Sequence, residues 1–161
     1  MAEQSSWSRG KDSFTAPLEL SYPYNRTVGT QLSRFFTSLM DSRLEGTRGS
    51  DGRVYFPPAE FDPLTGEQLS QWVDVADTGS VLSWTWQAQP ETGQPLDRPF
   101  AWALINLDGA DVPILHAVDA KAENNIATGS RVKVRWAENR TGGINDIACF
   151  ELLSSDQEGA N

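Results

Sequence analysis

The chain has 161 residues, enough for one domain with a packed core and a short accessory segment, and its 39% of hydrophobic residues are typical of a globular protein. Its 22 acidic and 13 basic residues give a net charge of −9, which favours solubility and argues against a nucleic-acid binder, because such proteins neutralise phosphates with clustered Lys and Arg. The sequence has no apolar run that could cross a bilayer, no secretory signal within residues 1–10 and a single cysteine, so we expect a cytoplasmic protein with no membrane partner and no intrachain disulfide.

The N-terminal part predicts a flexible tail over residues 1–16, then an extended strip and a helix over residues 17–46. Thr27 or Thr30 can cap the start of the helix, and Gly46 lies beyond its end. The helix either covers the chain's own core or forms part of a subunit interface. Its apolar residues recur with the spacing of one helix face: Val28, Leu32, Phe35, Phe36, Leu39 and Met40.

Residues 47–69 predict a loop-rich knuckle. The pairs Asp51-Gly52 and Asp62-Pro63 mark two turns, and short apolar stretches lie between them. We therefore expect two extended arms folded around turns.

Residues 70–153 predict a mainly β domain. About five strands alternate with turn signals, which suits a small closed barrel of the OB-fold type, and a β-sandwich remains the alternative. In the first long strand, Leu82, Trp84 and Trp86 share one face, and Gly79 allows the strand to bend and serve two sheets. The gap between Val118 and Arg131 suits the connector of an OB-fold, and residues 154–161 form a polar tail.

Several motifs resemble those of the DUF35 OB-fold family, over nearly the whole chain from residue 22 to residue 152. The most specific part is Phe56-Pro57-Pro58 followed by the strand that begins at Gly79. Further resemblance lies in Phe35-Phe36, Gly46, Trp72-Val73, Pro99-Phe100, the 107–109 turn and residues 129–132. The resemblance implies an N-terminal helix, a rubredoxin-like zinc ribbon and an OB-fold barrel.

The same resemblance implies a partner. The chain is most similar to the family members that accompany sterol-carrier-type thiolases in acyl-CoA metabolism. In the steroid-degrading branch of the family, the partner is an aldolase that cleaves a side-chain β-hydroxyacyl-CoA.

The chain departs from the family at the zinc ribbon, where the resemblance implies two Cys-x-x-Cys pairs. The matching positions hold Arg48, Asp51, Asp62 and Thr65. Structural zinc sites prefer thiolate and imidazole ligands, and a guanidinium offers no lone pair, so we expect no zinc and no other cofactor. Arg48 paired with Asp51 or Asp62 would hold the knuckle instead.

Two residues are of types that act in catalysis in many enzymes. His116 is the only histidine and lies in a predicted strand without a nucleophile motif, which leaves a structural role or an interface or site role open. Cys149, between Ala148 and Phe150, is predicted to be a buried and inert thiol. Trp84, Trp86 and Trp102 belong either to the core or to a surface that stacks an adenine or a sterol ring, and Trp136 belongs to the core.

We therefore predict a non-catalytic accessory subunit of a thiolase-like acyl-CoA aldolase or thiolase, one that supports C–C cleavage of a bulky acyl-CoA such as a steroid side chain. Two copies of each chain would form a heterotetramer, and direct contact with the CoA thioester is left open. The alternatives are a small stand-alone enzyme that acts on acyl-CoA through His116, and a single-strand nucleic-acid binder, which the charge disfavours. The candidate interface residues lie on the helix and on the following arm: Phe35, Phe36, Tyr55, Phe56, Pro57 and Pro58.

Overall fold

The computed structural model describes residues 8–10, 13–15 and 27–153. The expected extended strip over residues 17–25 and the C-terminal tail over residues 154–161 lie outside these residues. Near the N-terminus, β1 (Ser8–Gly10) pairs antiparallel with β2 (Ser13–Thr15). Over the part of the chain that is described, no helix is long and apolar enough to span a bilayer.

The predicted helix is α1 (Gly29–Met40). Capping by Thr27 or Thr30 was the wrong expectation, because Val28 occupies the N-cap and no side chain caps the helix. The helix ends at Met40, well before Gly46, and Ser42, with a φ of 57°, lets the chain reverse. The Ser42 amide donates to the Leu39 carbonyl at 3.0 Å and the Arg43 amide donates to the Ser38 carbonyl at 2.8 Å, which is a Schellman ending.

A three-stranded antiparallel sheet follows, built from β3 (Leu44–Arg48), β4 (Val54–Tyr55) and β5 (Trp72–Val75) in the order β4-β3-β5. The sequence places β5 in the OB-fold segment of residues 70–153, and in the structure its residues pair with β3 of the small sheet. A Cβ on Gly46 would lie 2.6 Å from the Tyr55 carbonyl oxygen, so glycine is required for β4 to approach β3.

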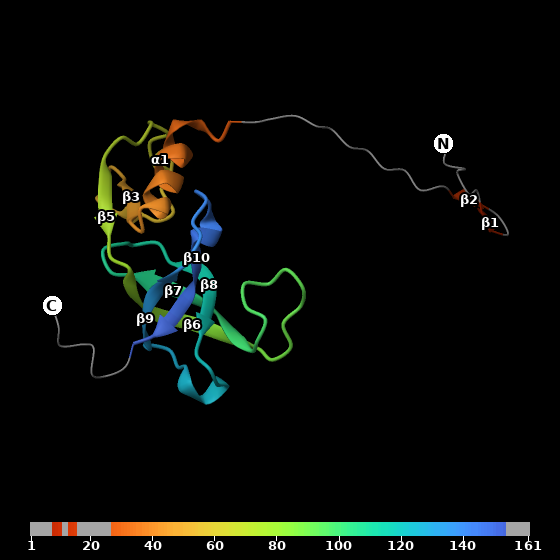
Figure 1. Ribbon diagram of the computed structural model, residues 1–161. Coiled ribbons are helices and arrows are strands. Elements are labelled where there is room, and N and C mark those ends of the chain that lie inside the picture. Colours follow the sequence, from red (N-terminus) through yellow and green to blue (C-terminus); the bar gives the residue numbers. More distant parts are fainter. Residues whose placement is uncertain (1–7, 11–12, 16–26, 154–161) are drawn as a thin grey trace.

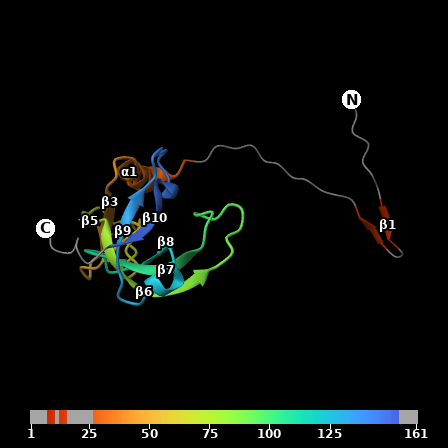
Figure 2. The same ribbon diagram turned by 60° about the horizontal axis from the view of Figure 1, so that its bottom comes forward.

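The five-stranded barrel is confirmed. Its strands are β6 (Thr78–Gln87), β7 (Phe100–Leu107), β8 (Ile114–Asp119), β9 (Arg131–Trp136) and β10 (Ile147–Leu152). They close in the order β10-β8-β7-β6-β9, which excludes the sandwich. The connector between β8 and β9 contains the short helix η1 (Glu123–Asn125), and η2 (Ile144–Asp146) precedes β10. The loop of residues 88–99 projects from the barrel (Figure 1, Figure 2).

Strand β6 serves two neighbours, as expected from Gly79. This glycine pairs with Leu107 of β7 and with Val132 of β9, and a Cβ there would lie 2.5 Å from the Asn106 carbonyl oxygen. A bulge between residues 81 and 83 then interrupts the alternation. Trp84 therefore packs against the core, whereas Leu82 is exposed, so these two residues do not share a face as predicted.

The helix and the small sheet lie together at one end of the barrel (Figure 1). Phe35 of α1 packs edge-on against Phe56 with the ring centroids 5.6 Å apart, and both belong to one core that continues into the barrel. On the other side of the helix, the Arg34 guanidinium binds the buried Glu45 carboxylate at 2.7 Å and lies 4.2 Å above the centre of the Trp72 ring. These contacts fix which face of α1 remains outside.

Candidate functional site

The six predicted interface residues differ in accessibility. Phe35, Phe56 and Pro58 are buried inside the chain, so they shape the fold and present almost no surface. Phe36 and Tyr55 are half-buried, and Pro57 is exposed. The apolar surface that a partner could reach therefore lies on the opposite edge of the helix stripe.

That surface follows α1 at a spacing of four residues and is called here the α1 face. It consists of Val28, Leu32, Phe36 and Met40, together with Ile144 from η2. Except for the half-buried Phe36, these side chains are 39% to 51% exposed. Exposed apolar residues in a contiguous stripe, backed by a packed core, are typical of a protein–protein interface.

The loop of residues 137–146 extends the α1 face, and hydrogen bonds hold this loop in place. The buried carboxylate of Asp146 accepts hydrogen bonds from the Thr141 amide at 2.8 Å and from the Gly142 amide at 2.9 Å. The Arg140 guanidinium also donates to the Met40 carbonyl at 2.8 Å. Ile144 is thereby held beside the helix.

The knuckle of residues 47–69 is closed by one carboxylate. Oδ2 of Asp62 accepts a hydrogen bond from the Ser50 amide at 2.7 Å, and Oδ1 accepts one from the Leu64 amide at 2.8 Å and a longer one from the Thr65 amide at 3.4 Å. Asp62 thus joins the two turns that the sequence predicted. The hydrogen bonds from Ser50 and Leu64 lower the pKa of Asp62 to about 2.

The predicted ion pair of Arg48 with Asp51 or Asp62 was wrong. The Arg48 guanidinium donates to the Gly52 carbonyl at 2.6 Å, and Asp51 pairs with Arg53 at 3.4 Å instead. The turn at Gly52 brings this carbonyl closer to Arg48 than either carboxylate. Arg48 therefore stabilises one turn, whereas Asp62 joins both.

The four positions that match the family's zinc ligands do not fit a zinc ion. One holds a guanidinium, and the carboxylate of Asp62 already accepts three amide hydrogens, which point where a cation would have to lie. Across the described part of the chain, no group of three or more His, Cys, Asp or Glu side chains is arranged to hold a metal.

Replacing Asp62 by asparagine is expected to loosen the knuckle and lower the melting temperature by a few degrees, because an amide NH2 would face an amide N–H at one of the two turns. Hydrogen exchange at the Ser50 and Leu64 amides should speed up, while exchange in the barrel stays unchanged. Since the pKa of Asp62 is lowered, its contribution to stability is present above the ordinary aspartate pKa and is lost as the pH falls towards 2.

Asp51→Asn provides the matched control, because the Asp51 carboxylate binds its near neighbour Arg53, through the amide at 3.0 Å and the guanidinium at 3.4 Å, and does not join the two turns. Equal exchange rates at the Ser50 and Leu64 amides in the two variants would show that Asp62 does not hold the knuckle.

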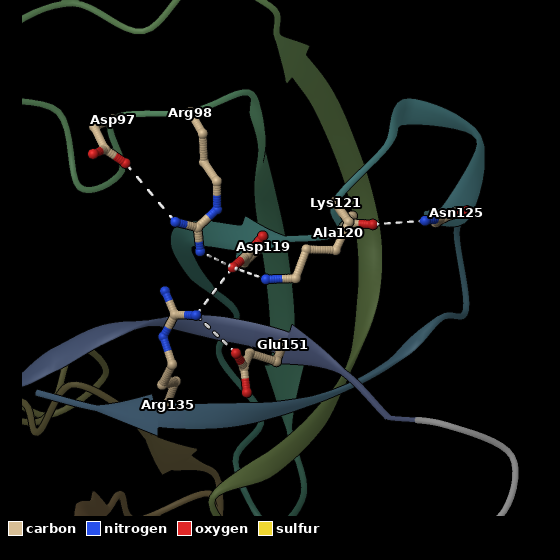
Figure 3. Close-up of polar contacts among 8 residues, drawn as sticks. All are labelled: Asp97, Arg98, Asp119, Ala120, Lys121, Asn125, Arg135 and Glu151. Atoms are coloured by element: carbon tan, nitrogen blue, oxygen red, sulfur yellow. Dashed lines mark hydrogen bonds and ion pairs between the residues drawn. The ribbon is translucent and has the colours of Figure 1, made fainter.

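A second buried carboxylate, that of Asp119, holds a cluster of charged side chains on the barrel (Figure 3). The Asp119 side chain is 0% exposed, and its Oδ2 binds Arg98, Lys121 at 2.7 Å and Arg135 at 3.0 Å. Burial alone would raise the pKa of Asp119, but the hydrogen bonds from the three cations lower it well below its usual range. Arg135 also binds Glu151 of β10 at 2.7 Å.

This cluster is structural in its effect, because it ties the loop before β7 to the ends of β8, β9 and β10. No sequence pattern indicates this cluster, since Arg98 and Arg135 are distant from Asp119 along the chain. A local signal exists only for Lys121, two residues away.

The two residues with catalytic potential lie in different packing environments. His116 is buried with its ring against Phe150, the ring centroids 5.5 Å apart. Cys149 is a free, buried thiol in a separate cluster with Leu96 and Phe100, and burial raises the pKa of this thiol to about 11. The geometry therefore assigns no nucleophile and base pair to these two side chains.

The four tryptophans considered above pack against the core, as the first of the two interpretations predicts. Trp84, Trp86 and Trp136 are partly buried against the main core, and Trp102 packs on the smaller cluster beside Phe100, with ring centroids 5.2 Å apart.

Comparison with known proteins gives the family context. Residues 72–137 match the domain family described as "ChsH2, C-terminal OB-fold domain". A DUF35 domain-containing scaffold protein of Pyrococcus furiosus is 26% identical over 105 residues, which cover 65% of this chain and 76% of that protein. These matches confirm the predicted resemblance to the DUF35 OB-fold family.

Two solved structures share the fold. A DUF35-family protein of unknown function from Sulfolobus solfataricus superposes with a TM-score of 0.55 at 21% identity, covering 78% of this chain and 83% of that one. A structure described as "Ltp2-ChsH2(DUF35) aldolase" gives a TM-score of 0.58 at 19% identity, covering 80% of this chain and 98% of the matched chain.

Proposed function

Taking the chain as an OB-fold protein of the DUF35 type, we propose that it is a non-catalytic accessory subunit that binds a thiolase-like aldolase. Two similar proteins support this proposal by their descriptions: one is a DUF35 domain-containing scaffold protein, and the other is described as an "Ltp2-ChsH2(DUF35) aldolase". The internal arrangement agrees with it, because neither His116 nor Cys149 is placed for nucleophilic catalysis.

The observation that carries the proposal is the α1 face. A helix normally buries its apolar stripe, but α1 buries only the side with Phe35 and Leu39 and leaves Val28, Leu32 and Met40 in water. The cost of exposing this stripe is removed when a partner covers it. We propose that the thiolase-like partner docks there.

The finer parts of the proposal concern the reaction. The complex would cleave a C–C bond in a bulky acyl-CoA, with a steroid side chain as the proposed acyl group, and the partner would contribute the catalytic residues. Two copies of each chain would form a heterotetramer in the cytoplasm. The knuckle would need no zinc, because Asp62 occupies the place of the ligands.

The test is co-expression of the full chain with the thiolase-like protein encoded nearest to it, followed by size-exclusion chromatography and an assay of acyl-CoA cleavage. We expect one complex that is active only when both chains are present. Separate elution, without any effect of this chain on the partner's activity, would overturn the proposal. Cleavage by this chain alone would favour the stand-alone enzyme.

A further inference from the structure

The second half of β6 has an open edge. Strand β9 pairs with β6 only at residues 78–80, whereas β7 follows β6 as far as Gln87. Among the described residues, the stretch 83–87 therefore has a strand on one side only, and no backbone hydrogen bond joins its other side to a loop. This stretch continues past β9 towards the loop of residues 88–99 (Figure 2).

The open edge lacks the usual protections against strand pairing. Edge strands are commonly blunted by charged side chains, by prolines or by a covering loop. Residues 78–89 contain no Asp, Glu, Lys, Arg or Pro, and the side chains of Ser83 and Thr85 are exposed. The bulge between residues 81 and 83 precedes the open stretch and leaves it regular. The edge can therefore accept another strand.

The sequence of this edge is nearly the same in both directions. Residues 83–87 read Ser-Trp-Thr-Trp-Gln. When two copies run antiparallel with Thr85 opposite Thr85, each Trp84 lies opposite a Trp86. Both tryptophans are only partly buried, so part of each ring is available to the other copy. Aromatic pairs and threonine pairs across strands stabilise a sheet, so the edge is complementary to a second copy of itself.

Charge limits how two copies can meet. Each copy has a net charge of −9, so two copies repel each other over most of their surfaces. A two-fold contact also brings each side chain near its own counterpart, so a charged strand would oppose itself. Strand β6 has no charged residue, whereas β9 carries Arg131, Lys133 and Arg135. The edge of β6 is therefore suited to self-association.

We propose that two copies of this chain associate through residues 83–87 of β6, which pair antiparallel about a two-fold axis at Thr85. The pairing joins β8, β7 and β6 of the two barrels into one continuous sheet. Because the edge is short, the dimer is weak, with a Kd on the order of 100 μM. The inference does not rest on the proposed thiolase-like partner, since both strands belong to copies of this chain.

The test is sedimentation velocity of the full chain at increasing concentration, where we expect a monomer–dimer equilibrium. Thr85→Lys places two positive charges opposite each other and should weaken the dimer at least about tenfold, and Thr85→Glu should do the same with negative charges. An equimolar mixture of the two variants should restore the dimer, because lysine then faces glutamate. Leu115→Lys is the matched control, since it adds the same charge at an exposed position on β8 and should dimerise like the natural chain.

Three results would overturn the proposal: a natural chain that stays monomeric up to about 1 mM, a Thr85→Lys variant that dimerises like Leu115→Lys, or a mixture no more dimeric than its two components. A milder substitution keeps the test decisive if the charged variants do not fold. With oxidised glutathione, Thr85→Cys should form a disulfide-linked dimer much faster than Leu115→Cys, and the buried Cys149 does not compete. Equal rates of cross-linking would contradict pairing at Thr85.

Discussion

Replacing Leu32 by glutamate is expected to release the chain from the proposed thiolase-like partner while leaving its fold intact. Leu32 lies in the middle of the α1 face, between Val28 and Phe36, so docking would bury the new charge without a partner for it. We expect the affinity to fall at least about a hundredfold, which equals a loss of about 3 kcal/mol. Co-elution and acyl-CoA cleavage by the mixed chains should both be lost.

The fold should tolerate this change because Phe35 and Leu39 hold the helix from its other side. Glutamate is a good helix former, and a negative charge in the N-terminal half of a helix is favourable. The circular dichroism spectrum and the melting temperature of the variant should therefore match those of the natural chain.

Leu115→Glu provides the matched control, since Leu115 is 60% exposed on β8, outside the α1 face. This variant should still form the active complex. Equal behaviour of the two variants, whether both bind or both fail, would show that the α1 face is not the docking site.

Asp119→Asn is expected to lower the free energy of unfolding by about 2–4 kcal/mol, because three cations lose the carboxylate that they share. The lower part of this range allows for the partial exposure of Arg98, Lys121 and Arg135, whose positive charges remain solvated. Urea denaturation of the full chain measures the change.

The control for this prediction is Asp97→Asn. Asp97 also pairs with Arg98, at 3.8 Å, but its side chain is 96% exposed, so the loss should stay within about 0.5 kcal/mol. A similar cost for the two variants would mean that the buried cluster does not stabilise the barrel.

The pH dependence of Asp119→Asn has a definite sign. Because the pKa of Asp119 is lowered in the folded chain, the carboxylate stabilises the fold fully above the unfolded aspartate pKa of about 3.9 and loses this effect as the pH falls. The difference between the natural chain and Asp119→Asn should therefore be largest near neutral pH and shrink in acid.

The barrel could be predicted from the sequence because its strands alternate and turn signals such as Asp108-Gly109 separate them. The pairing of β5 with β3 could not, because a short strand carries no mark of its partner. The bulge after Val81 was also hidden, since the residues on either side continue an alternating pattern. Local sequence patterns thus predicted the strands themselves better than they predicted which strands pair.

The candidate site shows the same division. Helical periodicity placed Phe35 and Leu32 on one broad stripe, but only the packing of Phe56 reveals which edge is covered. The sequence shows an aspartate at position 62 where the family has a metal ligand, yet the contact of its carboxylate with the Ser50 amide depends on how two turns approach each other. Such long-range contacts are set by the fold and leave no local pattern.

The cross-link formed by Asp62 has a consequence for the conditions under which the knuckle keeps its shape. A zinc ribbon depends on the supply of metal and on reduced thiolates, so chelation or oxidation can unfold it. A carboxylate that accepts hydrogen bonds from the Ser50 and Leu64 amides is complete as soon as the chain folds. Of these three conditions, only acid should therefore remove the cross-link, and neither zinc starvation nor oxidative stress should do so.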